Sequence, residues 1–376
     1  MAGTQRDTLN HLTIKGAKHY FLSTVYLNYY STPTNSILPD KANPNLLDSR
    51  LTNYNFSQMN IGYYVPLLTK DFKSKDSVRI SNFSLLTTGD IIVSTPHFNG
   101  IPDHNLYKIS FGFRGIYNNG KNDIFFADFT PLLFNDTRSL VDPSFKVAST
   151  LLWDHLVGAN FSFRLGITRT FIFGNRYFLP YIGLRLGRLD KVNLSIQFPR
   201  NIALNFPVGR HFKGSVFMKP MGGMYSFANT DSLYSGSDQT LQFGQWSLLS
   251  GLRIDYNPSN YCSFFLSSGI TQFNHISFAS TSFNTSNISV LTEFYTSHIK
   301  PGSFLNAGIT VRFGQAKQSY RNRNLYEMFD INNTIDPGDN NDGAGNGNIH
   351  APGNKKDYKN IRYKDIEDLM DSQELY

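Results

Sequence analysis

The residues of this chain that could do chemistry are basic side chains that alternate with apolar ones. Arg164, Arg185 and Arg253 each stand between two apolar residues. Successive side chains of an extended strand point to opposite faces, so these arginines would share a polar face. In a pore, rings of Arg or Lys lower the electrostatic barrier to anions. The sequence therefore predicts one set of lumen-lining residues, namely Arg79, Lys108, Arg114, Arg164, Arg185, Arg253, Asp255 and Arg312.

A second interpretation of the same basic residues stays open. In a barrel whose interior is filled by side chains, the arginines would be bound to Asp, Tyr, Asn and carbonyl partners, and no solute would pass. The sequence does not decide between an open lumen and a filled one.

Other kinds of site find little support. The nine histidines fall mostly in expected loops or at strand ends, and neither Gly-x-Ser-x-Gly nor His-Glu-x-x-His occurs. The acidic run 336–343 lacks the Glu that completes a calcium loop. The formal charge is +7, but the basic residues are scattered and form no nucleic-acid-binding motif. We expect no enzyme, no catalytic residue, no metal, no cofactor and no nucleic-acid partner.

The composition indicates an all-β chain with a partly apolar surface. Aromatic residues make up 15% and charged residues only 17% of the chain, and the mean hydropathy is −0.30. No stretch approaches the roughly 20 apolar residues of a membrane-spanning helix. A closed barrel also satisfies every backbone hydrogen bond in hydrocarbon, so strands could still span a membrane. The single cysteine, Cys262, has no partner for an internal disulfide and reads as a small apolar side chain.

Period-two alternation predicts the strands. It is clear at 107–115, and over 161–173 it is longer than the roughly 5–6 residues of an ordinary strand. It continues through 180–187 and 192–198, which makes a meander, and returns at 246–256, 264–271 and 305–313. Weaker strands are placed at 19–31, 53–66, 77–94, 122–134, 147–155, 201–208, 213–227 and 286–297. We predict an antiparallel transmembrane β-barrel of about twelve, possibly fourteen, strands and favour twelve.

The same alternation would fit a β-sandwich or a lipocalin-like barrel, in which the apolar face points inward. Two features favour the membrane barrel. The polar faces are rich in Gly, Ser and Thr, and tyrosines such as Tyr29, Tyr30, Tyr63, Tyr64 and Tyr256 resemble an interfacial girdle. Short turns at 174–175 and 257–260 contrast with long polar stretches at 32–52, 95–105, 135–146, 228–240 and 272–285, as expected of turns on one rim and loops on the other.

The chain divides into four predicted parts: an N-terminal periplasmic segment at 1–18, the barrel at 19–314, a disordered linker at 315–360 and a short amphipathic helix at 361–376. The linker is dominated by Asn, Gly, Asp, Lys and Arg. The predicted helix at 361–376 carries Tyr363, Ile366, Leu369 and Met370 at helical spacing. These four residues form a candidate docking face for a periplasmic or outer-membrane protein partner; the alternative is a frayed end without function.

One stretch carries a family resemblance. The run from Phe173 through Pro180 to Leu184, the Asp190-Lys191 turn and the strand that closes at Phe198-Pro199 resemble a Bacteroidota-type family of outer-membrane β-barrels of unknown function. The resemblance covers mainly residues 150–230 and departs at Val192, where such sequences often carry an aromatic residue. It implies a porin-like barrel in the outer membrane of a Gram-negative bacterium, and no active site.

The sequence thus favours an outer-membrane barrel in contact with lipid. The segment Met1–Asp7 has no apolar core, so we expect that a signal peptide has been removed. The favoured function is a narrow channel or transporter for small anionic solutes. The alternatives are a structural or accessory subunit of a larger outer-membrane assembly, which would dock partners through its loops and tail, and, with least support, an outer-membrane enzyme.

Overall fold

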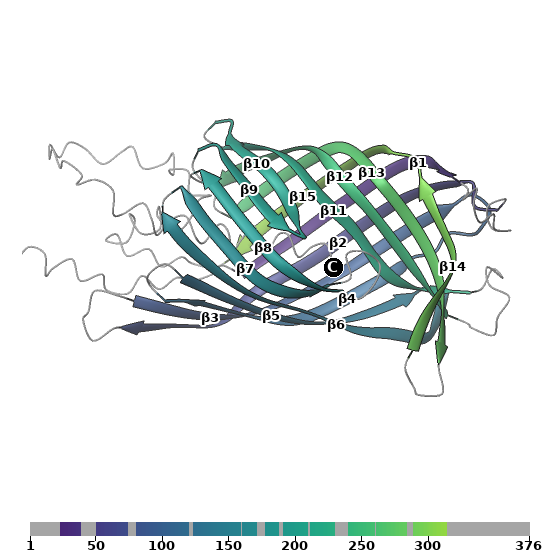
Figure 1. Ribbon diagram of the computed structural model, residues 1–376, viewed down its shortest axis with the longest axis horizontal. Helices are drawn as coiled ribbons and strands as arrows, with labels where there is room; N and C mark the ends of the chain where they lie inside the picture. The colour runs from purple at the N-terminus through teal and green to yellow at the C-terminus, as the bar shows by residue number, and fades with distance from the viewer. Residues whose placement is uncertain are drawn as a thin grey trace, which may run out of the picture.

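The computed structural model is a single antiparallel sheet that closes on itself (Figure 1). It describes residues 23–38, 50–73, 80–119, 123–158, 160–170, 177–187, 191–209, 211–229, 240–259, 261–283 and 289–313. The described part of the chain contains no helix long and apolar enough to cross a membrane.

Within the described residues fifteen strands follow one another, and nearly every strand pairs with its neighbour in sequence. They are β1 (Ser23–Leu38), β2 (Asn53–Lys73), β3 (Ile80–Phe98), β4 (Leu106–Asn118), β5 (Asp123–Asp136), β6 (Ser139–Gly158), β7 (Phe161–Thr170), β8 (Tyr177–Gly187), β9 (Asn193–Phe198), β10 (Asn201–Pro207), β11 (Phe212–Ala228), β12 (Thr240–Ser259), β13 (Cys262–Phe283), β14 (Ser289–Ile299) and β15 (Gly302–Phe313). Each weak segment placed from the sequence overlaps one of these strands.

Strands β14 and β15 occupy one position in the barrel. On β13, Asn274 pairs with Ile299 of β14 and Thr271 pairs with Gly302 of β15, so the register continues across the break at Lys300–Pro301. Proline cannot donate to the ladder, which explains the interruption. Fifteen strands therefore fill fourteen positions, an even number. The favoured count of twelve was wrong, because all the weakly patterned segments form strands.

The barrel closes between its first and last strands. Ser23 pairs with Phe313, and the register runs without a shift to Ser31 opposite Leu305. The described chain therefore enters and leaves at one rim, which we call the terminal rim; the opposite one is the far rim.

The outer face is apolar and the inner face polar, as the alternation predicted. On β4, Ile109, Phe111 and Phe113 are 45–48% exposed, whereas Lys108 and Arg114, which flank this run, are each 2% exposed. A soluble barrel would have the reverse facing, so that alternative is excluded. The predicted girdle was wrong at two positions: Tyr29, Tyr63 and Tyr256 face outward, but Tyr30 and Tyr64 are the next residues after Tyr29 and Tyr63 and are buried inside.

Two of the predicted loops are strands instead. Strands β5 and β6 leave only residues 137–138 of the expected 135–146 loop, and β13 runs through most of 272–285. In place of the expected 257–260 turn, β12 continues to Ser259 and β13 begins at Cys262. Both ends lie on the terminal rim, where two to six residues separate successive strands. The longest connections on the far rim comprise residues 39–52 and 229–239. The predicted turn at 174–175 lies outside the described residues.

The wall of the barrel is uneven in height. Strands β7–β10 have 10, 11, 6 and 7 residues, whereas β6 has 20 and β12 has 20. Strand β10 pairs with β11 only as far as Met218. Beyond that point β11 continues to Ala228 with β12 as its one described ladder partner. The far-rim half of β11 is therefore an exposed sheet edge unless something covers it.

Candidate functional site

Charged side chains on the inner face pair across neighbouring strands at mid-height. Arg114 of β4 lies opposite Asp128 of β5, and its Nε donates to Oδ2 of that carboxylate at 3.0 Å. Asp154 of β6 lies opposite Arg164 of β7, whose Nη2 donates to Oδ2 at 3.0 Å. We call these residues and their polar neighbours the polar belt: Asp90, Lys108, Ser110, Arg114, Asp128, Thr130, Thr150, Asp154, Arg164 and Thr168.

Pairing is what allows this charge inside the barrel. Both members of each ion pair are at most 6% exposed, and a buried charge is costly unless it is paired and hydrogen-bonded. Thr130 donates to the other oxygen of Asp128 at 2.7 Å, and the Arg114 guanidinium lies 5.3 Å from the Phe126 ring centre. Contacts between neighbours in register thus hold the belt together.

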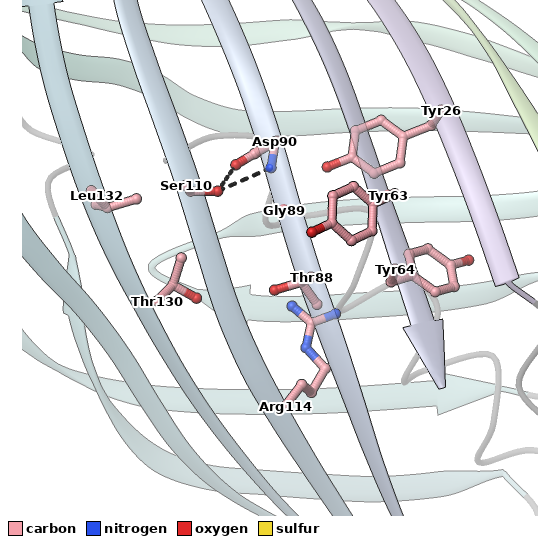
Figure 2. Close-up of a pocket in the computed structure, with 10 residues that line it drawn as sticks. All are labelled: Tyr26, Tyr63, Tyr64, Thr88, Gly89, Asp90, Ser110, Arg114, Thr130 and Leu132. Atoms are coloured by element: carbon pink, nitrogen blue, oxygen red, sulfur yellow. Dashed lines mark hydrogen bonds between the residues drawn. The ribbon is translucent and has the colours of Figure 1, made fainter. Parts of the chain in front are cut away.

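A small cavity opens into the belt beside β3 and β4 (Figure 2). Its volume is about 30 Å³, which is room for one or two water molecules rather than a solute. Asp90 accepts a hydrogen bond from the Ser110 hydroxyl, and that same hydroxyl accepts from the Asp90 amide at 3.2 Å. Lys108 and Arg114 are close enough to act electrostatically on Asp90. The cavity therefore lies in a charge-balanced part of the belt.

The other predicted lumen residues are distributed around the wall. Arg185 is 3% exposed on the inner face of β8. Arg253 of β12 donates from Nε and Nη2 to Oδ1 of Asp255, at 2.9 and 2.8 Å, and both side chains are about a quarter to a third exposed. Arg312 is half-buried opposite Thr24. Arg79 lies outside the described residues.

Sequence reasoning missed the carboxylates. Asp90, Asp128 and Asp154 lie on β3, β5 and β6, whose alternation is weak in the sequence, so their facing was not assigned. The signal was present on β5, where Ile124, Phe126 and Asp128 share one parity and all face inward. Four inner-face cations were missed as well: Lys146 on β6, Arg200 in the two-residue turn between β9 and β10, and Lys213 and Lys219 on β11.

Two apolar clusters adjoin the belt. At the level of the belt and on its terminal-rim side, one buried cluster comprises Tyr64, Leu86, Ile116, Ile124, Phe126, Leu152 and Tyr181. Toward the far rim a larger cluster fills the interior. Its centre, which we call the aromatic seal, comprises Tyr54, Phe98, Phe134, Tyr225, Phe227, Phe243 and Phe278, none more than 5% exposed.

The seal joins opposite walls of the barrel. Phe98 of β3 lies 5.9 Å from Phe243 of β12 and 5.7 Å from Phe278 of β13, measured between ring centres. The Tyr54 hydroxyl of β2 donates to Oε1 of Gln245 on β12 at 2.8 Å. Ring-to-ring distances of 4.5–7 Å are those of stabilising aromatic pairs. The lumen is therefore closed by packed side chains near the far rim.

The free edge of β11 is part of this closure. Strand β11 contacts β4, β5 and β6. Its residues 221–228, which we call the tucked segment, include Tyr225 against Phe134 of β5, the Ala228 amide bound to Asp136 of β5, and Met224 beside the Lys146 ammonium of β6. Nearly every one of these residues is buried, whichever face of the strand it lies on. Because β10 ends early, the unpaired edge is covered by turning inward.

A closed barrel with an apolar exterior and a paired, polar interior defines a class of protein. Exposure of its outer rows of Phe, Leu and Ile to water would be unfavourable, whereas their exposure to hydrocarbon is favourable. Closure of the barrel also leaves no sheet edge with unpaired backbone groups in the hydrocarbon. This chain is an outer-membrane β-barrel protein, located in the cell outer membrane.

Similarity to known proteins is found among solved structures. No protein-family model and no curated protein matches the chain, so the Bacteroidota-type resemblance stays a prediction. Among solved structures, an outer membrane channel from Pseudomonas putida F1 is similar at 10% identity, covering 79% of this chain and 98% of that one with a TM-score of 0.39. A FadL homologue of Pseudomonas aeruginosa (10% identity, 78% and 90% covered, TM-score 0.30) and LpxR from Salmonella typhimurium (10%, 77% and 100%, 0.31) are also similar.

Proposed function

We propose that this protein is a narrow channel or transporter for small anionic solutes. One observation carries the proposal: on the inner face, cations outnumber carboxylates among the side chains that the structure describes. The cations are Lys108, Arg114, Lys146, Arg164, Arg185, Arg200, Lys213, Lys219, Arg253 and Arg312. The carboxylates are Asp90, Asp128, Asp136, Asp154 and Asp255.

The excess matters because it lies inside a low-dielectric wall. Fields from like charges in such a cleft add up and raise the local concentration of counter-ions. The excess is also distributed over β4, β6–β8, β11, β12 and β15 rather than gathered at one point. A solute that follows the inner face would meet positive potential along much of its path, which favours anions over cations.

Planar-bilayer recording with asymmetric potassium chloride tests the proposal. We expect stepwise currents and a reversal potential that reports anion preference. The variant Arg253→Gln should lower that preference, because it removes a cation from the inner face. Since Arg253 is only partly buried, we expect this variant to fold. Arg169→Gln is the matched control, since Arg169 shares the outward parity of Leu165 and Ile167. Silence of the folded wild-type barrel and of every variant would refute the channel.

The aromatic seal favours a second candidate, in which the barrel is an accessory subunit of a larger outer-membrane assembly. Such a role needs no open lumen. Docking through Tyr363, Ile366, Leu369 and Met370 would then supply the contact with a periplasmic or outer-membrane partner. These four residues lie outside the described part of the chain. Deletion of residues 315–376 should release a protein that co-purifies with the full chain. If every partner is retained after the deletion, the docking face is contradicted.

A further inference from the structure

We infer that the tucked segment, together with residues 240–246 of β12, is a gate that opens the far rim. The inference rests on the proposed function only for the identity of the solute, small anions, that the open gate would admit. Its physical basis is the way the two strands are held.

The contacts that hold the gate shut are mostly between side chains. The Ser94 hydroxyl of β3 donates to the Tyr225 hydroxyl at 3.3 Å, and the Phe227 ring stacks on His104 at 3.7 Å. On the other face of β11, the Lys146 ammonium lies 3.2 Å from Oε1 of Gln242. Among the described residues, no β-ladder joins the tucked segment to β4, β5 or β6. The tucked segment can therefore move away from β4, β5 and β6 without breaking a ladder to them, while residues 241–246 of β12 keep their ladder to residues 275–280 of β13. Local opening of such a region is inexpensive relative to global unfolding.

One carboxylate draws the segments of the closed state together. Oδ2 of Asp136, at the end of β5, accepts from the Ala228 amide at 2.8 Å and lies 2.6 Å from Nδ1 of His104. Oδ1 accepts from the Arg138 amide at 3.1 Å. Asp136 is 1% exposed and His104 is fully buried. The tip of β11, the β3–β4 connection and the β5–β6 turn thus meet at a single side chain, which acts as the latch.

A line of backbone irregularities crosses the neighbouring strands where the gate begins. On β11 it is the run Pro220-Met221-Gly222-Gly223, whose glycines restrict the backbone least. Met221 pairs with Ser247 of β12, and the β12–β13 register shifts at that residue. The extra residue on β13 is Phe273, with a φ of +51°. Bulges bend a sheet locally, so β11 and β12 can flex here without disturbing the belt below.

The test measures exposure of Ser94, which the gate covers. In the full-length, folded barrel with Cys262→Ser, the thiol of a Ser94→Cys variant should react slowly with a water-soluble maleimide, since Ser94 is fully buried. Adding Asp136→Ala should speed labelling by roughly tenfold or more, because it removes hydrogen bonds to a charged group. His104→Phe, which keeps the stacking on Phe227 but loses the contact to Asp136, should act in the same direction if Asp136→Ala fails to fold.

Asp123→Ala is the matched control. Asp123 begins the same strand at the terminal rim and lies 2.6 Å from Nδ1 of His155, so it resembles the latch in chemistry but not in place. Equal labelling in the Asp136→Ala and Asp123→Ala variants, or rapid labelling without any latch variant, would overturn the gate. The same proteins in planar bilayers separate the two proposals. If the latch variants are labelled faster but no variant carries current, the gate is supported and the channel is refuted. If the wild type carries current but the latch variants leave labelling unchanged, the channel is supported and the gate is refuted.

Discussion

The polar belt and the aromatic seal fill the same barrel but are built in different ways. In the belt, the paired groups are neighbours on adjacent strands, separated by 10 residues for Asp154 and Arg164 and by 14 for Arg114 and Asp128. In the seal, Tyr54 and Phe98 are also neighbours on adjacent strands, as are Phe243 and Phe278. The hydrogen bonds that the seal tyrosines make are long-range, however: 131 residues separate Ser94 from Tyr225, and 191 separate Tyr54 from Gln245.

This difference explains what each region can do. The belt is fastened by the barrel's own ladders, so it cannot loosen unless neighbouring strands separate. The seal joins opposite walls through side chains alone over much of its area, so it can loosen while the ladders stay intact. We therefore expect a rigid middle and a movable end, and the following variants test that contrast.

The largest effect should come from breaking a belt pair. Asp154→Ala leaves the Arg164 guanidinium buried without its carboxylate, and removing one partner of a buried ion pair costs about 3–5 kcal/mol. Urea unfolding of the folded barrel in lipid measures the loss. The control is Asp154→Ala combined with Arg164→Met, which removes both charges. If the double variant is as unstable as the single one, the pair is not what stabilises the belt.

Charge placed on the outer face should cost somewhat less, and the cost should depend on depth. Phe111→Arg lies midway along β4 and should destabilise the barrel by about 2–4 kcal/mol, whereas Tyr117→Arg, near the terminal rim, should cost about 0–1 kcal/mol. Unfolding free energies in lipid vesicles give both values. Equal costs at the two positions would contradict the placement of the membrane along β4.

A smaller and more local effect is expected in the seal. Tyr54→Phe removes the hydroxyl that donates to Gln245, and leaving a buried acceptor unsatisfied costs about 1–3 kcal/mol. Hydrogen–deuterium exchange should quicken at 240–246 and stay unchanged at 162–168 in the belt. Tyr29→Phe, on the outer face at 49% exposure, is the control that should change neither region. Uniform quickening would mean that seal and belt open as one unit.

The smallest effect should come from the exposed ion pair at the far rim. His97 and Asp103 contact each other with side chains 48% and 54% exposed. Such pairs are worth about 0–1 kcal/mol and are screened by salt. Asp103→Asn should therefore leave the free energy of unfolding in urea nearly unchanged at 0.15 M salt. The comparison is Asp136→Ala, whose histidine partner is the adjacent His104. If both variants lose the same stability, burial is not what distinguishes the two histidine contacts.

Much of the fold could be predicted because strand alternation is a local property. Phe111 and Lys108 on β4, or Leu165 and Arg164 on β7, are assigned to opposite faces by parity alone, and the structure agrees. The number of strand positions was underestimated because the alternation is weak in segments such as 147–155, which carry polar residues on both faces: Ser149 and His155 on one, Thr150 and Asp154 on the other. The acidic partners Asp128 and Asp154 were missed for the same reason, since a facing that is not assigned cannot suggest a partner.

The sequence by itself determined the class of fold, the facing of the clear strands and the inward facing of the cations on those strands, because each follows from a period of two residues along the chain. Only the tertiary structure decided that β7–β10 stop short, that the edge of β11 turns inward and that Phe98, Phe243 and Phe278 meet across the lumen. The reason is physical: these contacts depend on which strands lie opposite each other around the closed barrel, and the alternation within any one strand carries no record of that.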